Sequence, residues 1–484
     1  MLLLCYRTKM ALNLLIALLM LAAPCAVAQK RPAKTSKSAS AGKTLAKAKR
    51  ERDPAIAQAI KDVSPQRVQQ TIEKLVSFGT RSTLSVNNPD AATSSQGIVA
   101  ARNWIKSEFE RISSECNGCL EVKTDTFIEQ SKGPKDRIIQ PTEIQNVYAI
   151  LKGTDPVQAK RIFLVTGHYD TRNTDVMNTT GAAPGANDDG SGTTVSLECA
   201  RVLSKHKFPA TIIFLTVAGE EQGLNGSTHF AKMAKEQGWQ LEGVLNNDIV
   251  GGNTTPGDTA QNKNWVRVFS EGIPAAASEA DIRRIRGLGG ESDSSSRELA
   301  RYISAVGDEY DFESFGPKLI FRRDRYLRGG DHSAFNEQGF AAVRFTEYRE
   351  DFNHQHQTLR TENGIEYGDL PKFVDFAYVA NVARLNAATL ASLASAPPVP
   401  PEVHILTKGL ENDSKIEWKP APGATAYEVL WRKTTDADFP EENSQRTTET
   451  KVDLPDSKDN VIFGVRSIDA KGHKSLVVIP EPER

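Results

Sequence analysis

The sequence has no strong excess of either charge and contains few cysteines. Its 60 Lys and Arg nearly balance its 61 Asp and Glu, so no overall field attracts nucleic acid or an anionic membrane surface. It also lacks the G-x-S-x-G elbow of serine hydrolases, the H-E-x-x-H metalloprotease helix and a phosphate-binding loop. Function is therefore expected in a local site of a different type.

The one strongly apolar run lies at the N-terminus. Arg7 and Lys9 precede "MALNLLIALLMLAAPCAVA", which has the layout of a secretory signal with cleavage after Ala28. The alternative, a retained membrane anchor, is disfavoured because the run is short and contains Pro24. We expect a secreted or periplasmic protein with no stable membrane span after cleavage.

Three cysteines remain after such cleavage, and an oxidising compartment would let two of them pair. "CNGC" has an Asn-Gly turn at its centre, which allows Cys116 and Cys119 to close a small loop. Cys199 lies in the apolar stretch "VSLECARVL" and is expected to be a buried free thiol. A redox-active CxxC is the alternative, but no thioredoxin-like pattern surrounds it.

The order of the segments predicts an α/β domain. Residues 29–52 are basic and small, as in a flexible tether. Residues 53–396 begin with helical periodicity, and apolar strands then alternate with helices, the strands being expected at 144–153, 161–167, 211–219, 243–248 and 341–347. This alternation predicts a mostly parallel sheet sandwiched by helices.

Beyond the proline-rich "APPVPPEV", the pattern of the sequence changes. Residues 402–484 show short alternating strands separated by Pro, Gly and Asp turns, which predict a small β-sandwich. The placement of Trp418, Tyr427 and Trp431 resembles a fibronectin type III module used for attachment or spacing. The linker predicts that this module folds independently. The alternative is an extra sheet packed on the main domain.

Chemically active side chains gather at the ends of the predicted strands. His168 follows the strand at 161–167, Glu220 and Glu221 follow the next strand, and Asp248 ends the third. Ligands bind at the carboxyl ends of the strands in open α/β sheets, so these side chains are expected at one edge. The loop "GANDDGSG" brings Asp188 to the same edge.

A further ligand is offered by "NHQHQ", which contains His354 and His356. Two His, two Asp and one Glu, without thiolate, suit a catalytic zinc site. A carboxylate at Asp188 can bridge two cations about 3.5 to 4 Å apart. Three glycines of this loop would let its backbone approach the site closely: Gly185, Gly190 and Gly192.

Several motifs resemble the M28 zinc aminopeptidase family, in its exported bacterial form, from about residue 65 to 395. They are "TGHYDTR", "APGANDDGSG", "AGEEQGLNGS", "NNDIVGG", and "GGDHSAF" with "NHQHQ". The resemblance implies a phosphorylase/hydrolase-like α/β sheet and two zinc ions. It implies that His168 and Asp248 hold one ion, that Glu221 and the later histidine hold the other, and that Asp188 bridges both.

Catalytic roles follow from the resemblance and from chemistry. The resemblance makes Glu220 the general base, which takes the proton of the metal-bound water and returns it to the leaving amine. Asp170, two residues after His168, is placed to orient the imidazole. The alternative for Asp170 is an ordinary acid in a turn.

The chain departs from the family at the last ligand. The family usually has "YH" followed by Thr or Ser and Pro, whereas this chain has "NHQHQTLR". We favour His356 as the ligand and leave His354 as the alternative. By resemblance, Asp331 and His332 lie near the pocket as supporting or substrate-contacting groups, while the alternative is that Asp331 caps a helix.

The sequence thus predicts an exported two-zinc metallopeptidase, most simply an aminopeptidase acting on peptides or proteins. The alternatives are a carboxypeptidase or glutaminyl cyclase-like enzyme on the same scaffold, or a binding protein that keeps the fold without catalysis. Four arginines serve either a substrate carboxylate or a solvated face: Arg322, Arg323, Arg325 and Arg328. No feature of the sequence indicates an oligomeric state.

Overall fold

The computed structural model describes residues 52–483 apart from residues 92, 94, 256, 311 and 313. The expected signal peptide, residues 1–28, lies outside the described residues, as does all but the last residue of the expected tether at 29–52. Among the helices of this described part, none combines the length and the apolar character that crossing a membrane requires.

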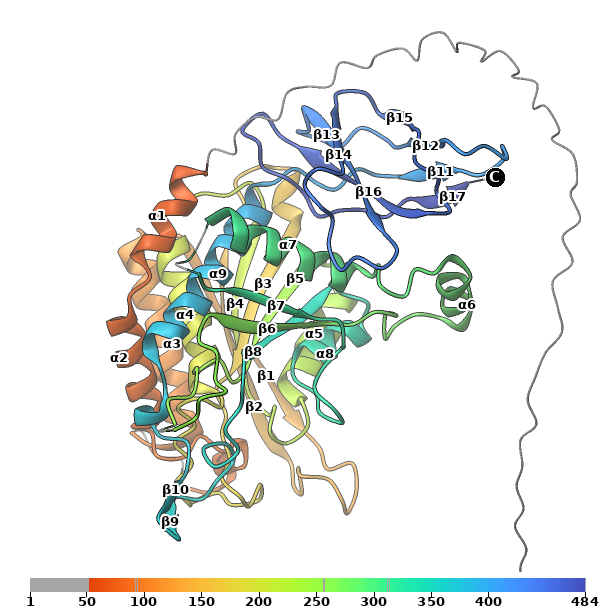
Figure 1. Ribbon diagram of the computed structural model, residues 1–484. Helices are drawn as coiled ribbons and strands as arrows, with labels where there is room; N and C mark the ends of the chain where they lie inside the picture. Colours follow the sequence, from red (N-terminus) through yellow and green to blue (C-terminus); the bar gives the residue numbers. More distant parts are fainter. Residues whose placement is uncertain are drawn as a thin grey trace, which may run out of the picture. The chain divides into compact units, whose positions relative to one another are not determined.

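A sheet of eight strands forms the centre of the protein, in the order β1-β2-β4-β3-β5-β8-β6-β7 (Figure 1). β3 pairs in parallel with β4 and β5, and β5 pairs in parallel with β8, whereas β1, β2 and β6 join the sheet antiparallel. The strands are β1 (Leu120–Glu129), β2 (Thr142–Leu151), β3 (Arg161–His168), β4 (Thr211–Val217), β5 (Gln240–Asn247), β6 (Trp265–Ser270), β7 (Gly316–Ile320) and β8 (Ala342–Glu347). The predicted α/β fold with a largely parallel centre is confirmed.

Helices cover both faces of this sheet (Figure 1). One face packs against α1 (Pro54–Asp62), α2 (Pro65–Val76), α3 (Gly97–Glu115), α4 (Gly190–Leu203), α7 (Ser295–Tyr310) and α9 (Phe376–Ser395). The other face packs against α5 (Asn225–Glu236) and α8 (His332–Glu337). Smaller elements complete this region: η1 (Thr83–Asn87), η2 (Gln158–Lys160), η3 (Pro371–Phe373), α6 (Glu279–Leu288), β9 (Arg360–Glu362) and β10 (Ile365–Tyr367).

The two-sided cover explains why the central strands read as continuous apolar runs. On β3, Phe163 and Val165 point into the core beneath α4 and α9, while Leu164 between them points into the core beneath α5 and α8. Successive side chains of a strand face opposite sides, so both sets must be apolar when both faces are covered. Polar side chains then concentrate at the strand ends.

The C-terminal residues form two small sheets around a separate apolar core. One sheet has the order β15-β12-β11-β17 and the other the order β14-β13-β16. Trp418, Tyr427 and Val429 belong to the cluster that they share. The strands are β11 (His404–Leu406), β12 (Ser414–Glu417), β13 (Ala426–Lys433), β14 (Ser444–Thr447), β15 (Lys451–Leu454), β16 (Val461–Ile468) and β17 (Glu481–Glu483). The fibronectin type III likeness and the domain boundaries stay predictions.

Buried polar contacts join these sheets to α7 and the segment before it. Arg432 forms an ion pair with Asp293, and both side chains are almost fully buried. Nε of Arg301 donates to the carbonyl of Ala437 at 2.7 Å, and the hydroxyl of Tyr302 donates to the carbonyl of Lys474 at 3.0 Å. Such contacts lead us to expect that the C-terminal sheets do not fold independently, despite the proline-rich linker.

The cysteine predictions are confirmed. Cys116 and Cys119 form a disulfide, and Cys199 is a buried free thiol on α4.

Candidate metal centre

Acidic and histidine side chains converge at one edge of the central sheet. His168 is the last residue of β3, Asp248 directly follows β5, and Glu221 lies in the loop after β4. Because β3, β4 and β5 run parallel, their carboxyl ends meet at the same edge. Asp188 reaches this edge from the loop before α4, and His356 reaches it from the loop after β8.

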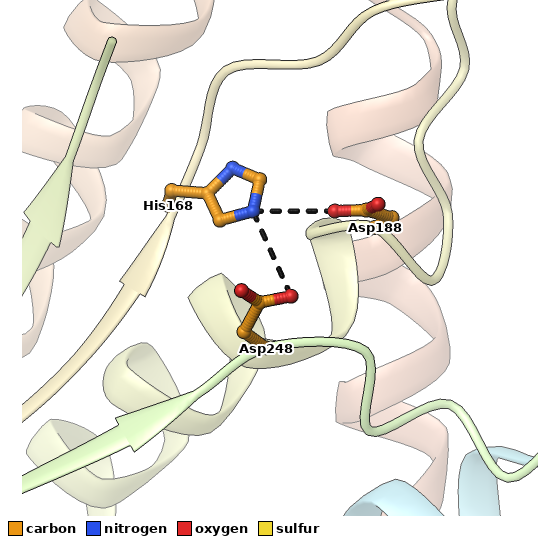
Figure 2. A group of neighbouring side chains, drawn as sticks. All are labelled: His168, Asp188 and Asp248. Atoms are coloured by element: carbon orange, nitrogen blue, oxygen red, sulfur yellow. Dashed lines mark ion pairs between the residues drawn. The ribbon is translucent and has the colours of Figure 1, made fainter. Parts of the chain in front are cut away.

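Asp188 and Asp248 both face Nε2 of the His168 imidazole (Figure 2). Nε2 of His168 lies 3.2 Å from Oδ1 of Asp188 and 3.9 Å from Oδ1 of Asp248. All three side chains are buried, and their ligand atoms lie within 4.8 Å of one another. These residues therefore form a group able to hold a cation.

A second group shares Asp188 with the first. Nε2 of His356 lies 2.7 Å from Oδ2 of Asp188 and 2.9 Å from Oε1 of Glu221. The ligand atoms of these three residues also lie within 4.8 Å of one another. The two oxygens of Asp188 thus serve different groups, which is the arrangement expected of a bridging carboxylate.

The contacts of these side chains fit zinc. Within the described part of the chain, the buried Oε1 of Glu221 accepts no well-aligned hydrogen bond, although it lies close to His356. A buried carboxylate oxygen without such a bond is costly unless a cation satisfies it. Imidazole nitrogens and carboxylate oxygens without thiolate are the donors of catalytic zinc sites.

The charges at this edge shift the pKa values of its members in different directions. Burial alone would lower the pKa of His168. Four nearby carboxylates raise this pKa well above its ordinary value: Glu220, Asp170, Asp188 and Asp248. Burial works against ionisation of Asp188, yet His356 and His168 hold its pKa well below the usual range. Asp188 and each of the two histidines therefore stabilise each other's charged forms.

Glu220 belongs to neither group, although it is next to Glu221 in the chain. Its side chain keeps part of its surface exposed, while that of Glu221 is buried. Desolvation raises the pKa of Glu220 well above its ordinary value, and the charges of Asp248 and Glu221 raise it further. The two neighbouring glutamates thus have different surroundings.

Asp170 contacts Nδ1 of His168, the ring nitrogen that does not face Asp188 and Asp248. Nδ1 of His168 lies 3.1 Å from the carbonyl oxygen of Asp170 and 3.4 Å from its Oδ1. Oδ2 of Asp170 accepts hydrogen bonds from the Thr83 hydroxyl at 3.0 Å and from the backbone N–H of Glu221 at 3.2 Å. Asp170 therefore links the end of β3 to the loop that carries both glutamates.

Asp189, the second acid of the "DD" pair, binds backbone groups near the site. Its carboxylate accepts from the backbone N–H of Gly192 at 2.8 Å, which caps α4, and from that of His168 at 3.0 Å. The peptide bond between Asp188 and Asp189 is cis. The two neighbouring carboxylates point to different partners, so they do not compete for one position.

The two glycines at the ends of this loop are explained by different constraints. Gly185 has a φ of +53°, in the left-handed region that favours glycine. Gly192 has no such φ, but a Cβ added there would lie 2.0 Å from the carbonyl oxygen of Asn247. The close approach of α4 to the end of β5 therefore requires glycine at Gly192.

His354 belongs to neither ligand group and contacts other residues. Its ring stacks on Phe373 with centroids 3.5 Å apart, and its Nδ1 lies 3.4 Å from Asp351 and 3.3 Å from the Thr255 hydroxyl. The geometry thus favours His356 over His354 as the last ligand.

The sequence also drew attention to Asp331, His332 and the four arginines of 322–328. Asp331 is fully buried, which raises its pKa to about 7, and its side chain makes no capping bond to α8. Nε2 of His332 donates to the carbonyl of Arg323. The four arginines of 322–328 contact protein groups: Arg325 and Arg328 pair with Glu350, Arg323 pairs with Glu337, and Arg322 lies over the ring of Tyr326.

Sequence reasoning missed two arginines that contact the ligands. Nη2 of Arg344, a fully buried residue on β8, lies 2.9 Å from Oδ1 of Asp248. Nε of Arg172 lies 3.3 Å from Oε2 of Glu221, and its Nη2 lies 2.9 Å from Nδ1 of His356. The signal for Arg344 was present, because an arginine inside the apolar strand "AAVRFTE" needs a buried anion.

Comparisons with known proteins agree with this geometry. The model of a family described as peptidase family M28 matches residues 146–378. A probable zinc metalloprotease of Pyrenophora tritici-repentis is 45% identical over 430 residues, which are 87% of this chain and 86% of that protein. A probable zinc metalloprotease of Leptosphaeria maculans is 43% identical over 426 residues, covering 87% of this chain and 96% of that protein. Both relatives are fungal, so they lend no support to the bacterial origin expected from the sequence.

Among solved structures, the LapA aminopeptidase of Legionella pneumophila is similar to this chain with a TM-score of 0.47 and 21% sequence identity. The match covers 76% of this chain and 80% of that one.

Proposed function

The chain belongs to peptidase family M28 and is a zinc metallopeptidase, and from this premise we propose that it is an exported two-zinc aminopeptidase. In this proposal His168 and Asp248 hold one zinc ion, Glu221 and His356 hold the other, and Asp188 bridges both. The substrates are peptides or proteins with a free N-terminus.

The observation that carries the proposal is the division of Asp188 between two histidines. Its Oδ1 lies 3.2 Å from His168 and its Oδ2 lies 2.7 Å from His356. One carboxylate that faces two separate ligand groups supports two cations rather than one. His354, with its separate contacts, has no role in this centre.

Zinc, when bound, supplies Lewis acidity that makes water a better nucleophile near neutral pH and polarises the substrate carbonyl. Glu220 then performs the proton transfers. Its carboxylate accepts a proton from the attacking water as the new C–O bond forms, and it gives that proton to the amine nitrogen as the C–N bond breaks. The position of Glu220 beside the ligands, but outside both groups, supports this role.

Asp170 and Arg344 support the ligands without touching substrate in this scheme. Asp170 fixes the orientation of the His168 ring through its contacts with Nδ1. Arg344 holds Asp248 through an ion pair to its Oδ1. These contacts keep the ligand geometry while the substrate binds and leaves.

The surroundings of the arginines favour an aminopeptidase over a carboxypeptidase. A carboxypeptidase needs a cation that binds the substrate carboxylate. In the described part of the chain, the arginines of 322–328 are engaged by Glu350, Glu337 and Tyr326. A glutaminyl cyclase-like activity remains the second candidate, because it would use the same ligands and the same base.

Export completes the proposal and rests on the signal-like N-terminus, which the sequence places at residues 1–28. The oxidised Cys116–Cys119 pair supports an oxidising compartment.

The activity is tested by comparing the hydrolysis of aminoacyl chromogenic amides, which have a free amine, with that of peptides whose N-terminus is blocked. We expect hydrolysis of the free-amine substrates, loss of hydrolysis after chelation, and its return with zinc. Hydrolysis of blocked peptides would contradict an aminopeptidase. Conversion of an N-terminal glutamine to pyroglutamate with release of ammonia, without peptide hydrolysis, would instead establish the second candidate.

A further inference from the structure

The loop that carries Asp188 is held mainly through its own backbone. We call residues 184–190 the bridge loop. Arg81 lies on one side of it and is almost fully buried. Nη1 of Arg81 donates to the carbonyl of Pro184 at 2.7 Å, and Nη2 donates to the carbonyl of Gly185 at 2.9 Å. Arg81 also binds the carbonyl of Tyr169 at 2.7 Å, just after β3.

Asp369 binds the bridge loop through the opposite kind of backbone group. Its Oδ1 accepts from the N–H of Asn187 at 2.8 Å, and its Oδ2 accepts from the N–H of Asp188 at 2.7 Å. The carbonyl of Asp369 accepts from the N–H of Ala186 at 3.3 Å. Three consecutive N–H groups of the bridge loop are therefore bound by one buried aspartate.

The two contacts complement each other electrostatically. Carbonyl oxygens meet a guanidinium, and N–H groups meet a carboxylate, so each peptide dipole faces a charge of the favourable sign. Arg81 lies 103 residues before Pro184, and Asp369 lies 181 residues after Asp188. The conformation of the bridge loop therefore depends on two distant segments of the chain.

The bridge loop has little room to adopt another position. A Cβ added to Gly185 would lie 2.1 Å from Cγ2 of Thr171 and 2.6 Å from the carbonyl oxygen of Asp188. The N–H of Gly190 donates to the carbonyl of Gly185 at 2.9 Å, which closes the loop on itself. A change in either anchor should thus be transmitted to Asp188 rather than absorbed within the loop.

We propose that Arg81 and Asp369 are positioning residues for the metal centre: together they fix the backbone of the bridge loop so that the Asp188 carboxylate faces both ligand groups before any ion binds. This inference rests on the proposed bridging role of Asp188. Neither residue touches substrate or metal, and each acts only through the backbone that carries Asp188. Removal of such supporting contacts typically weakens metal affinity about 10- to 100-fold.

Metal titration of the purified mature protein, stripped with a chelator, tests the proposal. Co²⁺ is added, and its visible absorption reports occupancy independently of catalysis, while thermal unfolding of the metal-free protein reports folding. Asp369→Asn keeps the shape of the side chain but puts an N–H donor against a backbone N–H. We expect it to weaken Co²⁺ binding by about 10- to 100-fold. Arg81→Lys should weaken binding in the same direction.

Matched controls separate positioning from general stability. Asp375 also accepts two backbone N–H bonds, from Ala377 and Tyr378 at 3.1 Å each, but at the start of α9. Asp375→Ala removes this cap and should lower the unfolding temperature without weakening Co²⁺ binding. Arg161, buried and bound to the carbonyl of Ala396 at 2.8 Å, provides the control Arg161→Lys.

The double variant Arg81→Lys/Asp369→Asn should lose less affinity than the sum of the single losses, because both residues act on the same loop. Wild-type Co²⁺ affinity in Asp369→Asn, with only the unfolding temperature lowered, would overturn the proposal. If Asp188→Asn itself left Co²⁺ binding unchanged, the bridged metal centre would be wrong, and the positioning proposal would fail with it.

Discussion

Glu220 and Glu221 are consecutive residues, yet only Glu221 has its carboxylate within a ligand group. Oε1 of Glu221 lies 2.9 Å from His356, whereas Glu220 stands beside the group with part of its surface exposed. One loop after β4 thus carries both the proposed ligand and the proposed base.

The two glutamates should respond differently to the same substitution. Glu220→Gln should keep zinc and fold while the rate falls by about 10²- to 10⁴-fold, because an amide cannot accept the proton of water. The loss should appear mainly in kcat. Glu221→Gln should lower the zinc content itself. Loss of zinc in Glu220→Gln with zinc retained in Glu221→Gln would exchange the two roles.

The two histidines of "NHQHQ" offer a second contrast. His356→Ala should lower zinc content and activity together, because His356 contacts both Asp188 and Glu221. His354→Ala removes a ring stacked on Phe373 and should leave the zinc content near that of the wild type. Zinc analysis of both variants measures this, and the reverse ranking would move the ligand by two residues.

The ion pair between Arg432 and Asp293 predicts that the C-terminal sheets stabilise the peptidase region. Both side chains are almost fully buried. Asp293→Asn leaves the Arg432 charge without its partner, and breaking a buried pair typically lowers the free energy of unfolding by about 3–5 kcal/mol. Urea unfolding measures this value. The exposed pair of Arg283 and Glu279 gives the control Arg283→Gln, with an expected change below about 0.5 kcal/mol. Equal, small effects of both variants would contradict a stabilising interface.

His473 gives this interface a pH dependence. Its Nε2 lies 3.0 Å from Asp53, the N-cap of α1, and its Nδ1 lies 2.9 Å from Asp469. Burial lowers the pKa of His473, but the two carboxylates raise it above its ordinary 6.5 overall. The pKa values of Asp53 and Asp469 are lowered, so both acids stay ionised near neutral pH.

The stabilisation by His473 is therefore complete below about pH 6.5 and is lost as the pH rises through the raised pKa. The difference in free energy of unfolding between wild type and His473→Gln should shrink over that interval. Denaturant unfolding at pH 6 and at pH 9 measures it. If the difference in free energy of unfolding grew with pH, the charged imidazole between Asp53 and Asp469 would be contradicted.

Local patterns predicted five of the eight strands of the central sheet, but not β1, β6 or β7, and they predicted most of the metal centre. Apolar runs bounded by acids or histidines marked the strand ends, and parallel pairing brings such ends together, so His168, Asp248 and the two glutamates were found from sequence. The choice between His354 and His356 depended on how the loop after β8 folds, and spacing alone does not determine that.

Arg81 and Asp369 were not predicted, because their partners in the bridge loop are backbone groups more than 100 residues away. No local pattern records such a contact. The prolines of the linker predict independent folding of the C-terminal sheets, whereas the contacts of Arg301 and Arg432 lead us to expect that the two parts stabilise each other.

The zinc content of the purified protein and of Asp188→Asn tests the central claim most directly. The account predicts two zinc ions per wild-type chain, because Asp188 faces His168 with one oxygen and His356 with the other. It also predicts that Asp188→Asn loses zinc and hydrolysis together. One zinc ion per wild-type chain, with zinc content and rate unchanged in Asp188→Asn, would contradict the bridged centre.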